Sequence, residues 1–320
     1  MILPSLDSLK AAADLVYGVI PPTAQIRWPL LAERSGAEVW VKHENHNPTG
    51  AFKVRGGVVY VEELKRHDPC ATGVIAATRG NHGQSVAFAA ARAGLKSVMV
   101  VPHGNGREKN AAMRALGAEL VEHGSDFQEA YEHAVLLAET KRLHMVRSFD
   151  AALLRGVASY ALELFQNVTD LDAVYVPIGL GSGICGTIAV RDALGLATEI
   201  VGVVASHAPA YALSHAAGRP VASNVTPTIA DGMAVRVPNP AALEIILRGV
   251  ARIVTVQEEE IKASMRHLFS DTHNAAEGSG AAGLAALLQE RERMRGRRVA
   301  LILSGGNVDR EVFAEILTEK

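Results

Sequence analysis

Short apolar segments alternate with helical segments along most of the chain, and this alternation limits the folds that the chain can adopt. The helical segments include residues 127–139, 258–269 and 281–293. Strands that alternate with helices favour a mostly parallel sheet with helices on both faces. We therefore predict an α/β fold. The segments that read as strands are 39–42, 73–77, 97–101, 119–121, 173–176, 200–204, 252–256 and 299–303.

Size and charge narrow the class of protein. The 320 residues are 48% hydrophobic, which is enough for the chain to bury a large core. A chain of this length is expected to divide into two domains. A formal net charge of −2 gives no electrostatic reason to expect nucleic acid or an anionic membrane as a partner. The N-terminal MILPSLDSLK has neither a basic start nor a long apolar stretch. We therefore expect a cytoplasmic protein without a signal peptide or membrane span.

One lysine stands in a glycine-rich setting that suits covalent chemistry. Lys53 lies in ENHNPTGAFKVRGG, between Gly50 on one side and Gly56 and Gly57 on the other. An amine can form a Schiff base with an aldehyde cofactor only when it is deprotonated, and burial favours that neutral form. The alternative is a solvated lysine that happens to lie near glycine.

Two loops have the pattern of anion-binding turns. ATRGNHGQS, residues 77–85, follows an apolar run and precedes the helical stretch 86–93, so backbone N–H groups can be aimed at an anion. VPIGLGSGICG, residues 176–186, contains glycines that let the backbone wrap a phosphate. It lacks the last glycine of the dinucleotide fingerprint, which favours a single phosphate. The alternative in each case is an ordinary turn between a strand and a helix.

Two further segments complete the pattern. AEGSGAAGLAAL covers residues 276–287, and LILSGGNVD covers residues 301–309. Ser304 follows the apolar strand 299–303, at the carboxyl end where ligands collect in open α/β sheets. Its hydroxyl could face the ring nitrogen of a cofactor, or it could belong to an ordinary strand-terminating turn.

Taken in order, the five segments resemble the fold-type II pyridoxal-phosphate enzymes, with the tryptophan synthase β-subunit-like fold. The match is closest to the serine/threonine dehydratase and serine racemase branch, and it runs from about residue 20 to about residue 311. The resemblance implies pyridoxal 5'-phosphate as cofactor. It also implies a large domain of residues 1–65 and 148–320, a small domain of residues 66–147 inserted into it, and an active site in the cleft between them.

The resemblance assigns a role to each candidate residue. Lys53 would be the Schiff-base lysine and the base for the α-proton, with Phe52 beside the ring. The expected cofactor contacts are Asn81 to the ring hydroxyl, Gly179, Leu180, Gly181, Ser182 and Gly183 to the phosphate, Ser304 to the ring nitrogen, and Glu277 near the ring. The expected substrate loop is Thr78, Arg79, Gly80, Asn81 and His82.

The expected serine at the pyridine nitrogen favours elimination. A hydroxyl there leaves the nitrogen largely unprotonated, so the ring is a weaker electron sink and a β-substituent is expelled rapidly. We predict a dehydratase that removes water and then ammonia from a β-hydroxy-α-amino acid of the serine or threonine type. The product would be a 2-oxo acid. A homodimer is expected from the resemblance.

The chain also departs from the family pattern. Arg79 stands where this branch usually has serine, and arginine cannot act as a base near neutrality, which argues against two-base racemisation. Ser206 and Ala212 stand where racemase-like enzymes place carboxylates for a divalent cation, so no metal is expected. Three alternatives stay open: an amino-acid racemase, a β-replacement synthase, and a non-catalytic protein that binds pyridoxal phosphate or an amino acid. The β-replacement synthases usually have threonine at the position of His82.

Overall fold

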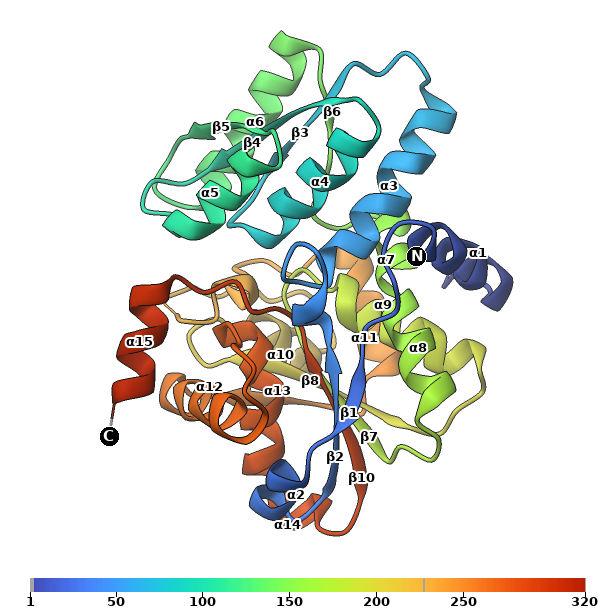
Figure 1. Ribbon diagram of the computed structural model, residues 1–320, viewed down its shortest axis with the longest axis vertical. Helices are drawn as coiled ribbons and strands as arrows, with labels where there is room; N and C mark the ends of the chain where they lie inside the picture. Colours follow the sequence, from blue (N-terminus) through green and yellow to red (C-terminus); the bar gives the residue numbers. More distant parts are fainter. Residues whose placement is uncertain (1–2, 227, 320) are drawn as a thin grey trace.

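The computed structural model describes residues 3–226 and 228–319. Its strands form a six-stranded sheet in the order β1-β2-β10-β7-β8-β9 and a four-stranded sheet in the order β5-β4-β3-β6. In Figure 1 the smaller sheet lies above the larger one, and α3 runs from one toward the other. The strands are β1 (Gln25–Arg27), β2 (Glu38–His43), β3 (Gly73–Ala77), β4 (Lys96–Val101), β5 (Glu119–Glu122), β6 (His144–Met145), β7 (Ala173–Pro177), β8 (Glu199–Ala205), β9 (Arg252–Val256) and β10 (Arg298–Leu303).

Helices fill most of the chain between the strands. The α-helices are α1 (Leu6–Tyr17), α2 (Pro29–Ser35), α3 (Lys53–His67), α4 (Asn81–Arg92), α5 (Arg107–Ala115), α6 (Phe127–Lys141), α7 (Ala151–Val157), α8 (Ser159–Asn167), α9 (Ser182–Ala193), α10 (Ala210–Ala217), α11 (Pro240–Gly249), α12 (Glu258–Thr272), α13 (Gly278–Gln289), α14 (Arg291–Met294) and α15 (Arg310–Thr318). Two 3-10 helices are η1 (Glu44–His46) and η2 (Asp231–Met233). None of the helices in the described part is both long and apolar enough to cross a membrane.

Parallel pairing dominates both sheets, as the alternation of strands and helices predicts. Among the strand pairs of the described chain, only β1 with β2 is antiparallel. The predicted α/β fold class is therefore confirmed, and the eight predicted strands are present. The sequence analysis did not include the short strands β1 and β6. The prediction of one continuous helix over residues 281–293 is wrong, because α13 ends at Gln289 and α14 starts at Arg291.

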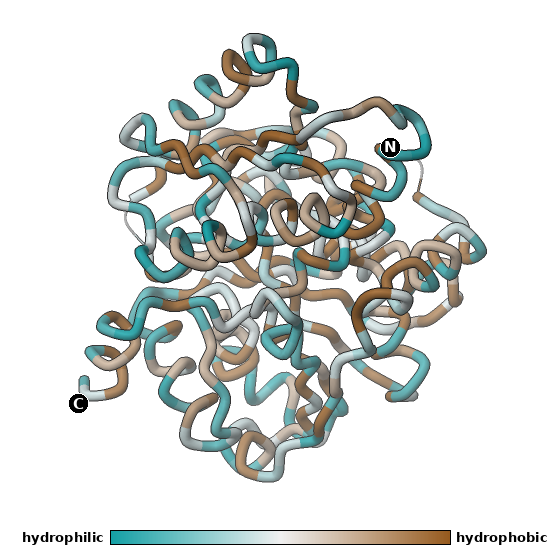
Figure 2. Tube along the Cα trace, turned by 45° about the horizontal axis from the view of Figure 1, so that its top comes forward, coloured by the Kyte–Doolittle hydropathy of each residue, from teal (hydrophilic) through white to brown (hydrophobic). Residues whose placement is uncertain are grey.

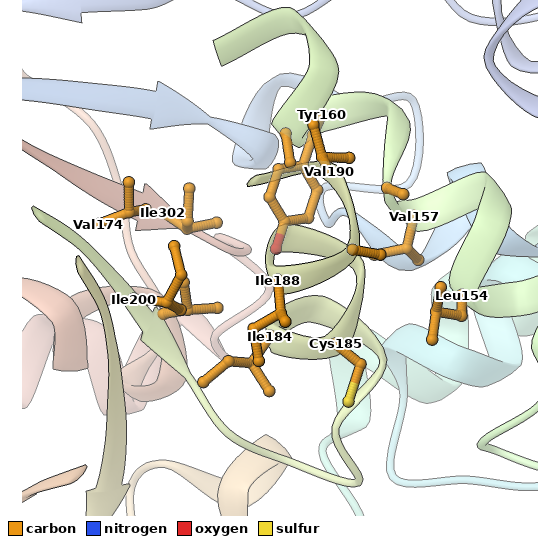
Figure 3. Packing of buried hydrophobic residues seen from close by; sticks show 14 of the residues in the cluster. Leu154, Val157, Tyr160, Val174, Ile184, Cys185, Ile188, Val190, Ile200 and Ile302 are labelled. Carbon is orange, nitrogen blue, oxygen red and sulfur yellow. The ribbon is translucent and has the colours of Figure 1, made fainter. Parts of the chain in front are cut away.

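Both faces of the larger sheet are covered by apolar helices. Neighbouring residues of β7 point to opposite faces, so Val174 packs into the cluster that includes Ile184 and Ile188 of α9, while Tyr175 packs into the cluster that includes α13. Figure 3 shows side chains of the α9 cluster, among them Tyr160 and Cys185. In Figure 2 the hydrophilic segments gather on outer loops and helix ends. The packing fixes α9, which begins at the candidate site residue Ser182, and α13, which begins directly after the candidate site residue Glu277.

Candidate active site

The structure places the amine of Lys53 at the first turn of α9. Lys53 is the first residue of α3, and its Nζ donates a hydrogen bond to Ser182 Oγ at 3.1 Å. The same Nζ lies 4.9 Å from the centre of the Phe52 ring. Removal from water lowers the pKa of the Lys53 amine to about 8. A substantial part of the amine is therefore neutral near physiological pH, as a Schiff-base lysine requires.

Backbone bonds join the segment before Lys53 to the segment after β10. The Phe52 N–H donates to the carbonyl of Ser304 at 3.0 Å, and the Gly306 N–H donates to the carbonyl of Gly50 at 2.9 Å. Gly50 has a φ of +66°, and a Cβ there would collide with the side-chain oxygen of Asn307. Glycine is needed at this position for both reasons. Ser304, which is 4% exposed, is thereby held next to the lysine segment.

At two positions, Gly179 and Gly181, the loop between β7 and α9 has no room for a side chain. A Cβ on Gly181, whose φ is +108°, would lie 2.6 Å from the Cβ of Ala242, and a Cβ on Gly179 would collide with the carbonyl of Gly232. The hydroxyl of Tyr211 donates to the carbonyl of Leu180 at 3.0 Å. The loop ends at the N-terminus of α9, where first-turn N–H groups have no partner inside the helix.

The predicted substrate loop forms a tight turn between β3 and α4. Thr78 Oγ1 accepts hydrogen bonds from the N–H groups of Gly80 and Gly83, both at 2.9 Å. Gly80 has a φ of +145°, and a Cβ there would lie 2.5 Å from Cδ of Lys109. The loop therefore depends on glycine at position 80, because the stem of Lys109 occupies the adjacent space.

Asn81 connects this loop to the larger sheet. Its Nδ2 donates to Glu277 Oε1 at 2.6 Å, and its Oδ1 accepts from Asn307 Nδ2 at 2.8 Å. Glu277 is 3% exposed and immediately precedes α13. Burial raises the pKa of the Glu277 carboxyl, although the ammonium of Lys109 acts in the opposite direction.

The remaining two residues of the loop differ in their surroundings. His82 is buried, and its pKa falls to about 3 through burial and the nearby Lys53 amine, so its ring is neutral. Its Nε2 is buried without a hydrogen-bond partner among the described residues. Arg79 is half-buried, and no ion pair or hydrogen bond of its side chain is present in residues 3–226 and 228–319. The structure thus brings both residues to the loop, with the Arg79 guanidinium and the His82 Nε2 unpartnered in the described chain.

Lys109 and Asp231 belong to the same cluster, and the sequence analysis missed them. Lys109 Nζ lies 2.8 Å from Asp231 Oδ2 and 3.3 Å from Glu277 Oε2. Lys109 comes from α5, beside the smaller sheet, whereas its two partners come from η2 and the start of α13. Nothing in the sequence around Lys109 signals these contacts, because both partners lie more than a hundred residues further along the chain.

The predicted absence of a metal rests on two positions. Ala212 lies on α10, and the buried Oγ of Ser206 has no hydrogen-bond partner in the described chain. Within the described ranges, no group of three or more histidine, cysteine, aspartate and glutamate side chains is arranged to hold a metal ion.

The assembled residues fit pyridoxal phosphate on their own chemistry. A buried amine with a pKa of about 8 can bond to the aldehyde, and the bare backbone of Gly179 and Gly181 before α9 can hold the phosphate. The unpartnered, buried Nε2 of His82 leaves a polar group available to a ligand.

Comparisons with known proteins agree with this fit. The model of the family described as "Pyridoxal-phosphate dependent enzyme" matches residues 16–305. The L-threonine ammonia-lyase of Thermotoga maritima is 33% identical over 316 residues, which cover 98% of this chain and 78% of that protein. The solved structure of a threonine deaminase from T.th. superposes with a TM-score of 0.89 at 32% identity, covering 96% of this chain and 99% of that one.

A racemase shares the same fold at lower identity. The serine racemase of maize superposes with a TM-score of 0.92 at 24% identity, covering 98% of this chain and 97% of that one. The family match spans both sheets and every candidate site residue from Phe52 to Ser304. This chain is therefore a member of the pyridoxal-phosphate dependent enzyme family, in its serine/threonine dehydratase branch.

Proposed function

We propose that the protein is a dehydratase of β-hydroxy-α-amino acids that yields a 2-oxo acid and ammonia. The observation that carries the proposal is the Lys53 amine, with its pKa of about 8, held against Ser182 at the N-terminus of α9. The L-threonine ammonia-lyase of Thermotoga maritima supports the same reaction class. We further propose a homodimer, and a site between a large domain of residues 1–65 and 148–320 and a small domain of residues 66–147.

Each site residue has a distinct task in this proposal. Lys53 would hold the cofactor through its amine, and the N-terminus of α9 with Gly179, Leu180, Gly181, Ser182 and Gly183 would hold the phosphate. Phe52 would lie beside the ring, Ser304 would face the ring nitrogen, and Asn81, positioned by Glu277, would bond to the ring hydroxyl. The loop from Thr78 to His82 receives the substrate. The bound cofactor supplies a sink for the electrons that the α-carbon releases.

Proton transfer at the α-carbon falls to Lys53, whose amine would be free for this task while the substrate is bound. Its neutral Nζ takes the α-proton, and the resulting ammonium gives that proton to the departing β-hydroxyl, which leaves as water. Ser182 Oγ orients the amine for this task. His82 is neutral, and its free Nε2 can hydrogen-bond to the substrate without changing the net charge of the site.

The charge at position 79 argues against racemisation. A two-base racemase needs a second base on the face opposite the lysine, and a guanidinium such as that of Arg79 does not act as a base near neutrality. The L-threonine ammonia-lyase at 33% identity favours elimination, whereas the serine racemase is only 24% identical, so elimination is the better proposal.

A panel of β-hydroxy amino acids tests the proposal. The holoprotein is incubated with serine, threonine and their larger or charged analogues, in each configuration, and ammonia and 2-oxo acid are measured. We expect equal amounts of both products from at least one compound, and a loss of several orders of magnitude in Lys53→Ala. Lys65→Ala, on the last turn of the same helix, is the matched control. Inversion without ammonia, or an inert yellow holoprotein, would reject the proposal.

A further inference from the structure

Arg79 lies in the loop where the site meets the smaller sheet. It is the second residue after β3, between Thr78, which ties the turn together, and Gly80, which packs on the stem of Lys109. Two residues further on, Asn81 is bonded to Glu277, and the next residue, His82, is electrostatically coupled to the Lys53 amine. The backbone of Arg79 is therefore fixed within a few residues of groups that contact the site.

The guanidinium of Arg79 differs from the other unpaired arginines of the chain. Within residues 3–226 and 228–319, six arginines form no ion pair: five are exposed, and Arg79 alone is half-buried. The exposed ones are Arg27, Arg92, Arg142, Arg147 and Arg219. A cation that is partly removed from water without a counter-charge is unfavourable. Such an arginine is expected to gain its partner from a ligand.

The other cation of the cluster is already engaged. Lys109 Nζ lies within 3.3 Å of a carboxylate oxygen of Glu277 and within 2.8 Å of one of Asp231. One ammonium therefore faces two carboxyl groups, and it has no charge to spare for an anionic substrate. Arg79 can supply the positive charge for an anionic substrate. Its planar guanidinium suits a carboxylate that is held by two hydrogen bonds.

The α-carboxylate of an amino acid has other donors available. At the start of α4, the N–H of Gly83 donates to Thr78 Oγ1, whereas those of Asn81 and His82 lie in the first turn and have no acceptor inside the helix. These N–H groups suit one carboxylate. The positive charge of Arg79 is then available to a second carboxylate of the substrate.

We infer that Arg79 determines specificity for a β-hydroxy-α-amino acid that carries a second carboxylate on its side chain. This inference rests on the proposed dehydratase function and names its substrate class. The simplest such compound is 3-hydroxyaspartate.

Kinetics with a charged and a neutral substrate test the inference. We expect 3-hydroxyaspartate to be the better substrate of the wild-type enzyme, and Arg79→Gln to raise its KM about 10- to 100-fold with little change in kcat, the range expected for a lost charged hydrogen bond. The kcat/KM for serine should fall by a clearly smaller factor than that for 3-hydroxyaspartate, because serine has no second carboxylate. Arg79→Lys should recover only part of the loss. Arg92→Gln, an exposed arginine at the other end of α4, should match the wild type on both substrates.

A binding measurement separates the inference from the proposed reaction. Malate has two carboxylates and no amine, so calorimetric titration of the holoprotein reports recognition without turnover, with lactate as the single-carboxylate control. We expect Arg79→Gln to weaken malate binding about tenfold or more and to weaken lactate binding by a clearly smaller factor.

Three results would contradict the inference while leaving the dehydratase intact. The first is that the wild type turns over serine as efficiently as 3-hydroxyaspartate. The second is that Arg79→Gln lowers kcat/KM equally on both substrates. The third is that the wild type binds malate no more tightly than the variant does. If no β-hydroxy amino acid is consumed, the proposed function fails, and the malate titration alone decides whether Arg79 recognises a second carboxylate.

Discussion

At the scale of single residues, the solvation of Lys53 sets when its amine can react. Burial lowers its pKa from the usual lysine value to about 8, so the neutral fraction rises with pH up to that point and is nearly complete above it. We expect the rate of cofactor attachment to the apoprotein to rise about tenfold per pH unit below pH 8 and to level off above it. Stopped-flow absorbance measures this rate. A rise that continues toward the pKa of a solvated lysine would show that the amine is not desolvated.

Sequence reasoning could identify the residues of the site that lie in recognisable local patterns. Lys53, Asn81 and Gly181 stand in short motifs, and the structure brings their segments together as expected. Lys109 and Asp231 were missed because a lysine on a polar helix and an aspartate in a loop look like solvated residues. Their importance comes from contacts between distant segments, which only the fold creates.

At the scale of elements, a buried charge network fixes the start of α3. Arg55, two residues after Lys53, is 0% exposed, and its guanidinium donates to Glu44 Oε2 at 2.7 Å and to Glu163 Oε1 at 2.6 Å. Glu163 also accepts from the buried Lys42. The network therefore joins β2, η1 and α8 to the helix that carries the lysine.

Removing one cation from this network should be costly. Arg55→Leu leaves Glu44 and Glu163 buried with too few partners, and we expect a loss of about 3–5 kcal/mol in the free energy of unfolding. Arg66→Leu removes an exposed pair with Glu62 on the same helix and should cost only about 0.3–0.5 kcal/mol. Urea denaturation of both variants gives the comparison. Equal losses would mean that the network does not stabilise α3.

The same scale shows what the pattern of elements could and could not predict. The apolar runs locate the parallel strands because those strands are buried on both faces. The strand β6 was not predicted because it contains only His144 and Met145, and two residues are too few to show an alternating or apolar pattern. Gly56 and Gly57 were interpreted only as neighbours of the lysine. In the structure they permit close helix packing, since a Cβ on them would lie 2.8 Å from the carbonyl oxygen of Leu153 and 2.7 Å from that of Ser85.

At the scale of the whole molecule, contacts on α5 join the two sheets. Asp309, after β10, accepts from the N–H groups of Arg107 and Glu108 at 2.9 and 3.1 Å, which caps the first turn of α5. Lys109 on the same helix pairs with Asp231 and Glu277. In Figure 1 the smaller sheet lies above the larger one. These contacts show that charges as well as packing join the two parts.

This arrangement predicts a pH-dependent defect in Lys109→Met. Burial already raises the pKa of Glu277, and loss of the ammonium should raise it further. A raised pKa in the folded state gives stability that is present at low pH and is lost as the pH rises through it. The melting temperature of the variant should therefore fall further below the wild type at about pH 8 than at about pH 5. A deficit that is the same at both values would show that Glu277 is not the cause.

Metal dependence is a second property of the whole molecule. Ser206 and Ala212 offer no carboxylate, and the described residues contain no group suited to a metal ion. We expect exhaustive chelation to leave activity and melting temperature unchanged, because an ion that bound the folded state would stabilise it by mass action. A loss that magnesium or calcium restores would contradict this expectation.

The proposed function depends most directly on Lys53, whose amine would hold the cofactor and take the α-proton of the substrate. Borohydride reduction of the holoprotein makes this bond permanent, and peptide mapping by mass spectrometry then identifies the modified lysine. We predict one phosphopyridoxyl group on Lys53, with Lys42 and Lys109, which are engaged in ion pairs, unmodified. Modification of another lysine, with Lys53 left free, would contradict the claim.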